Sequence, residues 1–271
     1  MDNHTEITLE DLDFGMKHMP NESGMGCDLW KSRILKNLPG RAKEDLLALF
    51  QKMERSVAFT VALLWSLIGL MPKPGGQGER PIALLSMSYR LWTRARRCEI
   101  GEWQHKKAGF WDTAVKHSSA LGAAVWRAFM DESSALLMQA TSSIFWDMEK
   151  FYDNINLSKL CDMATELGYP TTLLSLGLQM HMAPRVLVVN DSHISAGNPS
   201  NGIIAGCTQS NIFARILLFR ILQNTSSRYA ETTRFRAFVD DIRQTTNHKR
   251  LSKTASDAAT AAVSLGSQLT E

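Results

Sequence analysis

Apolar and polar positions along this chain follow two different periods, and the period changes from one segment to the next. Apolar residues recur every three to four positions, the spacing of a helix, over residues 9–19, 43–55, 91–103, 118–130, 157–167, 171–182, 208–222 and 252–269. Short runs rich in β-branched, aromatic and other apolar residues predict strands, several paired as hairpins, at residues 66–71, 81–85, 143–148, 186–194, 234–239 and 242–246. Helices interleaved with antiparallel hairpins predict an α+β fold.

The most apolar stretch, residues 57–71, bears on whether the chain crosses a membrane. Thr60 and Ser66 interrupt it and Pro72 ends it, so it is too short for a span and predicts a core helix entering a strand. The first six residues are polar and acidic, unlike a signal peptide. We therefore expect an intracellular protein, nuclear or cytoplasmic, with no membrane partner.

The composition indicates a folded protein with a local basic region. The chain has 271 residues, 44% of them hydrophobic, which suffices for a sizeable core in one large domain or two smaller ones. The net charge is only +3, yet residues 73–107 hold eight basic and three acidic side chains together with Tyr89, Trp92 and Trp103. This region is either a surface for phosphates and bases or an ordinary solvated helix face. The four cysteines are widely separated, which indicates neither disulfides nor a zinc site and fits a reducing compartment.

Two adjacent aspartates, Asp240 and Asp241, lie between two predicted strands. Neighbouring carboxylates at a hairpin tip repel each other unless cations or protons intervene. The pair is therefore a candidate divalent-metal site, and the alternative is a solvated turn.

A third aspartate, Asp147, ends the predicted strand over residues 143–148. Phe145 and Asp147 share one face of that strand, so we expect the carboxylate at the rim of the core that Phe145 enters. The alternative is an acid that caps a strand-to-helix connection.

The surroundings of these aspartates resemble the motifs of reverse transcriptases, particularly those of non-LTR (LINE-like) retroelements and group II introns. Residues 147–155, Asp-Met-Glu-Lys-Phe-Tyr-Asp-Asn-Ile, are similar to the family's first catalytic motif, and residues 238–241 to its aromatic-x-Asp-Asp motif. Residues 199–210 resemble its glycine-containing motif, and residues 71–82 its fingers hairpin. Residues 16–28 look like a loosened version of the segment that opens LINE-type domains. The four motifs at residues 71–82, 147–155, 199–210 and 238–241 occur in the family's order, and this joint match is more specific than any one of them.

The resemblance implies a reverse-transcriptase-like palm, with an antiparallel sheet packed on helices, and a mostly helical fingers region. We expect the fingers in residues 1–135 and the palm in residues 136–271, with the chain ending before the thumb, as in a fragment of a retroelement polyprotein. It also implies that Asp147, Asp240 and Asp241 are catalytic and bind two Mg²⁺ ions, or Mn²⁺ in their place. The implied partners are an RNA template, a DNA primer and deoxynucleoside triphosphates.

Four further residues take nucleotide-binding roles from the same resemblance. Lys73 and Arg80 match the fingers residues that neutralise triphosphate oxygens, although Lys73 also reads as a surface lysine beside a turn. Tyr152 matches the aromatic residue that excludes a ribose 2′-hydroxyl. Gly206 belongs to a turn that lets backbone approach the template or the nucleotide closely.

Two departures from the family pattern, the expected lack of a thumb and an altered glycine-containing motif, leave other interpretations open. Most members have Pro-Gln-Gly where this chain has Ile204, Ala205 and Gly206, so the geometry around the template–nucleotide pair differs. One alternative is a catalytically inactive remnant that still binds nucleic acid. Another is a palm-type RNA polymerase, against which Tyr152 argues because such an enzyme must admit the 2′-hydroxyl.

Overall fold

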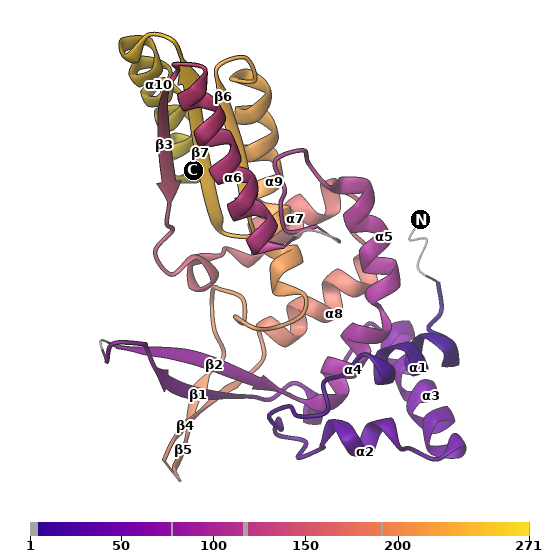
Figure 1. Cartoon of the computed structure of the whole chain (residues 1–271). Helices are drawn as coiled ribbons and strands as arrows, with labels where there is room; N and C mark the ends of the chain where they lie inside the picture. Colours follow the sequence, from indigo (N-terminus) through magenta and orange to yellow (C-terminus); the bar gives the residue numbers. More distant parts are fainter. Residues whose placement is uncertain (1–4, 77, 116–118, 191, 271) are drawn as a thin grey trace. The chain divides into compact units, whose positions relative to one another are not determined.

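A computed structural model describes residues 5–76, 78–115, 119–190 and 192–270 (Figure 1). The chain divides into two compact units, each assembled from two separate stretches. The first unit comprises Met1–Trp103 and Tyr152–Phe213, and the second comprises Gln104–Phe151 and Ala214–Glu271. Both mix helices and strands, which confirms the α+β class. The division of fingers from palm near residue 135 stays a prediction, because the units follow packing and not the family's regions.

Helices dominate the first unit. Those that lie in it wholly or in part are α1 (Leu9–Lys17), α2 (Ser32–Lys36), α3 (Gly40–Ser56), α4 (Met87–Ala95), α5 (Arg97–Lys107), α7 (Leu157–Glu166), α8 (Thr171–His181) and α9 (Ser210–Arg228). Sequence signals set several of their ends: a capping box between Thr8 and Asp11 begins α1, and the Ser86 hydroxyl accepts the Tyr89 amide to begin α4. Tyr89 and Trp92 then enter the core fully buried, each packed edge-on or tilted against its aromatic neighbours.

The helix expected over residues 91–103 is instead two helices that break at Arg96. Arg96 is buried, and its Nε donates to Glu54 Oε1 on α3 over 2.6 Å. Trp92 Nε1 donates to the same oxygen over 2.8 Å. The break thus coincides with a buried long-range ion pair, which local periodicity does not reveal.

A four-stranded sheet completes the first unit. Its strands are β1 (Ser66–Pro72), β2 (Glu79–Leu85), β4 (Arg185–Val189) and β5 (Ser192–Gly197), in the order β2-β1-β4-β5. Both predicted hairpins are confirmed, and a parallel pairing of β1 with β4 joins them. The core helix expected before β1 was wrong, because α3 ends at Val57 in a left-handed conformation and only a 3₁₀ turn over Val61–Leu63 follows.

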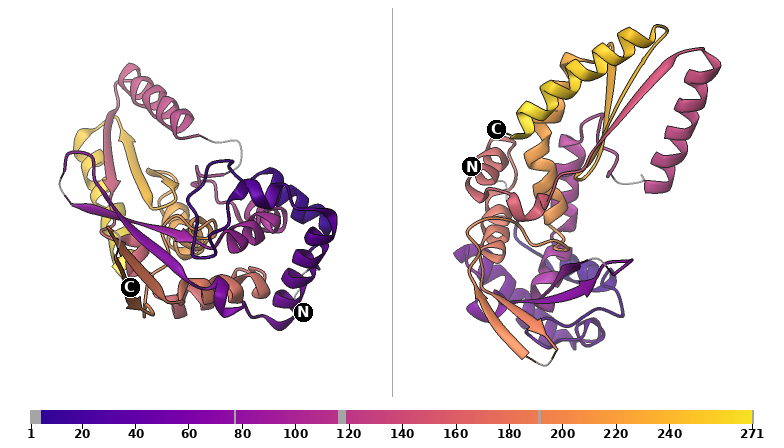
Figure 2. Two further views of the ribbon diagram at one scale, coloured as in Figure 1. Left: turned by 90° about the horizontal axis from the view of Figure 1, so that it is seen from below. Right: turned by 90° about the vertical axis from the view of Figure 1, so that its left-hand side faces the viewer.

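The second unit is built on a three-stranded antiparallel sheet. Its strands are β3 (Ala140–Trp146), β6 (Thr233–Phe238) and β7 (Asp241–His248), in the order β3-β7-β6. Helix α10 (Leu251–Thr270) and the later part of α9 cover one face, and α6 (Ala120–Leu136) lies on the other (Figure 2). Side chains from α9, α10 and the sheet form the buried apolar core, among them Leu218, Leu222, Phe235, Ile242, Ala261 and Leu265.

The expectation that Phe145 enters this core was wrong. Phe145 is 57% exposed, and the guanidinium groups of Arg127 on α6 and of Arg243 lie over its ring, with centroid distances of 4.8 and 5.7 Å. The adjacent Trp146 packs against the core instead. Alternation along a strand fixes which residues share a face but not which face is covered.

Among the residues that the structure describes, no helix is long and apolar enough to cross a membrane.

Candidate active site

The hairpin between β6 and β7 carries two of the predicted site residues. Phe238 pairs with Asp241, so Val239 and Asp240 form a two-residue turn and Asp241 begins β7. Val239 has a φ of 60°, which is rare for a β-branched residue. Such a conformation costs about 1–3 kcal/mol and persists only where the flanking structure imposes it. The β6–β7 ladder therefore holds Asp240 in a strained turn.

Asp147 reaches the same end of the sheet from β3. Trp146, the last residue of β3, pairs with Ile242, so the antiparallel register carries Asp147 to a position opposite Asp241. Asp147 and Asp241 are exposed, and Asp240 is half-buried. The structure thus brings Asp147 to the same end of the sheet as Asp240 and Asp241, which lie more than ninety positions later in the chain.

The three carboxylates influence one another electrostatically. The pKa of Asp240 is raised above its ordinary value, first by burial and then by the negative charges of Asp241 and Asp147, against a backbone hydrogen bond that lowers it. No salt bridge to any of the three is found within the described ranges. The end of the sheet is therefore a concentration of negative charge.

The donor set has the right chemistry for a hard divalent cation. Mg²⁺ takes oxygen ligands and is usually held by one or two carboxylates together with phosphate oxygens. The described residues contain no group of three or more His, Cys, Asp and Glu side chains arranged to enclose a metal ion. The carboxylates match Mg²⁺ by chemical type and by charge, but their side chains are not arranged so that three of them could hold an ion.

The turn that carries Gly206 lies in the first unit and is tied to the segment around Tyr152. Gly202 N donates to Ile155 O and Ile203 N donates to Tyr152 O, both over 2.8 Å. Gly202 has a φ of 83°, and a Cβ there would lie 2.7 Å from Asp153 O. Only glycine therefore permits this close approach. We refer to residues 202–206 as the nucleotide turn, after the role expected of Gly206.

Tyr152 itself is half-buried, and its hydroxyl donates to Asn211 Oδ1 near the start of α9 over 3.2 Å. Sequence reasoning did not consider Asn211. The available signal was its position in the first turn of the helix predicted over residues 208–222, shortly after the nucleotide turn. The phenol of Tyr152 is thus fixed by a residue next to the nucleotide turn.

Lys73 and Arg80 flank the tip of the β1–β2 hairpin. Arg80 pairs with Met71 within the ladder, and Lys73 N donates to Gly78 O over 3.0 Å beyond it. Both side chains are exposed. They are available to solvent anions, as expected for phosphate-binding groups and equally for surface residues.

The seven predicted site residues thus fall into two sets. The three aspartates belong to the second unit, whereas Lys73, Arg80, Tyr152 and Gly206 belong to the first.

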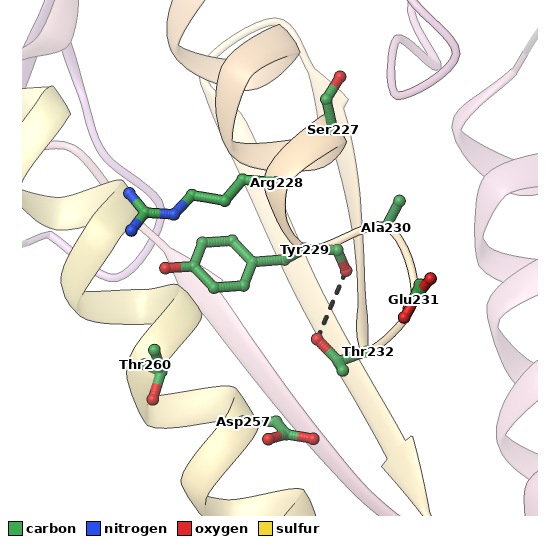
Figure 3. A pocket seen from close by; sticks show the side chains of 8 residues that line it. All are labelled: Ser227, Arg228, Tyr229, Ala230, Glu231, Thr232, Asp257 and Thr260. Atoms are coloured by element: carbon green, nitrogen blue, oxygen red, sulfur yellow. Dashed lines mark hydrogen bonds between the residues drawn. The ribbon is translucent and has the colours of Figure 1, made fainter.

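A cavity of about 460 Å³ lies elsewhere in the second unit, between the end of α9 and α10 (Figure 3). Arg228 lies over the ring of Tyr229, and Glu231 and Asp257 add opposite charge. Thr232 lines the cavity just before β6 begins, whereas Asp240 follows the end of that strand. The cavity and the carboxylates are therefore at opposite ends of β6, and no predicted site residue lines it.

The second unit is thus a three-stranded antiparallel sheet backed by helices, with carboxylates from two of its segments at one end. The sequence model of the family described as reverse transcriptase (RNA-dependent DNA polymerase) matches residues 71–266. The chain therefore belongs to the reverse transcriptase family. The match spans all seven predicted site residues, and residues 16–28 lie outside it. No curated protein matches the chain.

Proposed function

We propose that this domain synthesises DNA on an RNA template, extending a DNA primer with deoxynucleoside triphosphates, and that it comes from a retroelement of the non-LTR or group II intron type. The observation that carries the proposal is the meeting of Asp147 with the Asp240–Asp241 hairpin at one end of the sheet. Membership of the reverse transcriptase family supports the reaction class.

Asp147, Asp240 and Asp241 are the residues that would hold two Mg²⁺ ions, or Mn²⁺. Bound there, the ions would stabilise charge on the entering and leaving oxygens of phosphoryl transfer. Burial raises the pKa of Asp240 most, and the negative charges of Asp241 and Asp147 raise it further; those same charges would attract a cation.

The remaining site residues contribute binding and selection. Lys73 and Arg80 offer exposed positive charges to triphosphate oxygens, and arginine suits bidentate phosphate contact. Tyr152 excludes a 2′-hydroxyl by contact, with its ring held by Asn211. Gly206 has a φ of 89° with open space at its Cα, which suits close approach of a nucleotide to the backbone.

Primer extension on an RNA template tests the proposal. With Mg²⁺ we expect incorporation of deoxynucleotides over ribonucleotides, and Asp240→Asn should reduce it by at least about 1,000-fold. Glu231→Gln is the matched control, since it removes an exposed carboxylate from the same unit just before β6 begins. Extension by Asp240→Asn at the wild-type rate would reject the metal assignment.

Metal binding provides a readout independent of activity. Titration calorimetry with Mn²⁺ should give weaker binding for Asp147→Asn and Asp240→Asn than for Glu231→Gln. Template–primer binding without incorporation, with metal affinity equal in all variants, would instead favour a protein that binds nucleic acid only.

A further inference from the structure

The nucleotide turn is held by one side chain that no sequence motif indicates. Its first two amides donate to main-chain oxygens of Tyr152 and Ile155. The third amide, Ile204 N, donates to His181 Nδ1 over 2.9 Å. The Ile204 carbonyl in turn accepts from the Ser210 hydroxyl over 2.6 Å. His181 is the last residue of α8, so this bond anchors the turn to a helix that contains none of the predicted site residues.

The hydrogen bond fixes the state of the imidazole. Because Ile204 N donates, Nδ1 carries a lone pair and the ring proton lies on Nε2, a buried atom for which no hydrogen-bond partner is found among the described residues. The ring is fully buried and lies edge-on to Phe213, with a centroid distance of 5.4 Å. Burial, and after it the positive charge of Arg185, lowers the pKa of His181 to about 3. The imidazole therefore stays neutral, and an acceptor, at every pH at which a polymerase works.

The acceptor is needed because of the residue at position 204. Ile204 is 3% exposed, and its amide would be buried without a partner if the imidazole were absent. Leaving this backbone N–H without a partner would destabilise the turn. A proline at this position would have no N–H and would need no such acceptor.

We propose that His181 is a positioning residue for the nucleotide turn: its neutral imidazole accepts the Ile204 amide and so fixes the turn that presents Gly206. The proposal rests on the proposed function in one respect, that the turn contacts the nucleotide. His181 touches no reacting group, and its effect on synthesis runs through the geometry of residues 202–206.

A double-mutant cycle tests this role. His181→Leu should raise KM for the deoxynucleotide about tenfold with a smaller change in kcat, because the turn is displaced while the carboxylates are not. His181→Asn, whose Oδ1 is an acceptor, should recover part of the loss. In an Ile204→Pro background the amide is gone, so His181→Leu should change KM less than about twofold relative to that background. In the matched Ile204→Ala background the amide remains, and the full tenfold effect should persist.

Equal effects of His181→Leu in the proline and alanine backgrounds would overturn the proposal, since the imidazole would then act by packing alone. Two measurements do not depend on activity. The change in unfolding midpoint should show the same coupling between positions 181 and 204. In NMR of ¹⁵N-histidine-labelled protein, one histidine should keep the Nε2–H tautomer from about pH 5 to pH 8, and titration of that ring would contradict the assignment. If no variant incorporates nucleotide but the stability coupling is present, the proposed function fails while the positioning role stands.

Discussion

The Asp240–Asp241 hairpin and the nucleotide turn differ in how their polar groups are satisfied. In the turn, three consecutive amides have acceptors within the first unit, and glycine allows backbone to lie against backbone. In the hairpin, the carboxylates of Asp240 and Asp241 repel each other and that of Asp147 beside them, and Val239 is held at positive φ. The amides of the turn are thus satisfied within the protein, whereas the carboxylates of the hairpin have no ion-pair partner among the described residues. Substitutions in the turn should therefore lower stability, and substitutions in the hairpin should relieve strain or repulsion while removing function.

Gly202→Ala gives the largest effect on stability. The added Cβ meets Asp153 O at 2.7 Å in a conformation, φ 83°, that alanine rarely adopts. We expect a loss of about 2–4 kcal/mol in the free energy of unfolding, measured by denaturant titration. Gly206→Ala is the matched control: its φ is 89° but no atom lies within 4 Å of the added Cβ, so the loss should be about 1 kcal/mol. Equal losses would show that the close approach at Gly202 is unimportant.

Tyr152→Ala distinguishes the role of the Tyr152 side chain from that of its backbone carbonyl. The Tyr152 carbonyl that accepts Ile203 N is retained, so the turn should remain folded. We expect the preference for deoxynucleotides over ribonucleotides to fall at least about tenfold, measured as the ratio of kcat/KM values. Asn211→Ala, which removes the acceptor for the Tyr152 hydroxyl, should lower the preference less. An unchanged preference in Tyr152→Ala would remove this residue from the site.

Val239→Gly should stabilise the protein. Its φ of 60° is strained for valine and free for glycine, and the gain is partly offset by the larger entropy of the unfolded glycine chain. We expect a net increase of about 0.5–1 kcal/mol in the free energy of unfolding. A decrease would indicate that the Val239 side chain packs more tightly than its half-buried state suggests.

Replacing Asp240 should give the smallest change in stability, and the direction of that change follows from its pKa. Its folded pKa is raised above the ordinary 3.8, so the folded state holds the proton more tightly than the unfolded chain. The contribution of Asp240 to stability is then fully present below pH 3.8 and is lost as the pH rises through the folded pKa. At neutral pH and without divalent metal, Asp240→Asn should be more stable than wild type by a few tenths of a kcal/mol. The difference should shrink toward acid and in high salt, and a variant less stable than wild type at neutral pH would contradict the repulsion.

Much of the architecture follows from local sequence signals. Residues 234–239 and 242–246 alternate clearly enough to predict β6 and β7, and the gap between them holds Asp240. Asp147 was expected at the end of a strand, and it follows β3 directly. The predicted roles of all seven site residues stay predictions.

What the sequence did not reveal depends on contacts between distant segments. The pairing of β1 with β4 has no local signal, and the break at Arg96 coincides with its bond to Glu54 on another helix. The exposure of Phe145 depends on which face α9 and α10 cover. His181 and Asn211 were missed for the same reason, since each acts on a residue more than twenty positions away.

The parallel pairing of β1 with β4 has a consequence during translation. The β1–β2 hairpin leaves the ribosome roughly 100 residues before β4 is made, which at about 5–20 residues per second is a delay of several seconds. Throughout that interval β1 has one edge without its neighbour, and an open edge readily recruits strands from other chains. We therefore expect the nascent first unit to depend on chaperones until residues 185–189 emerge.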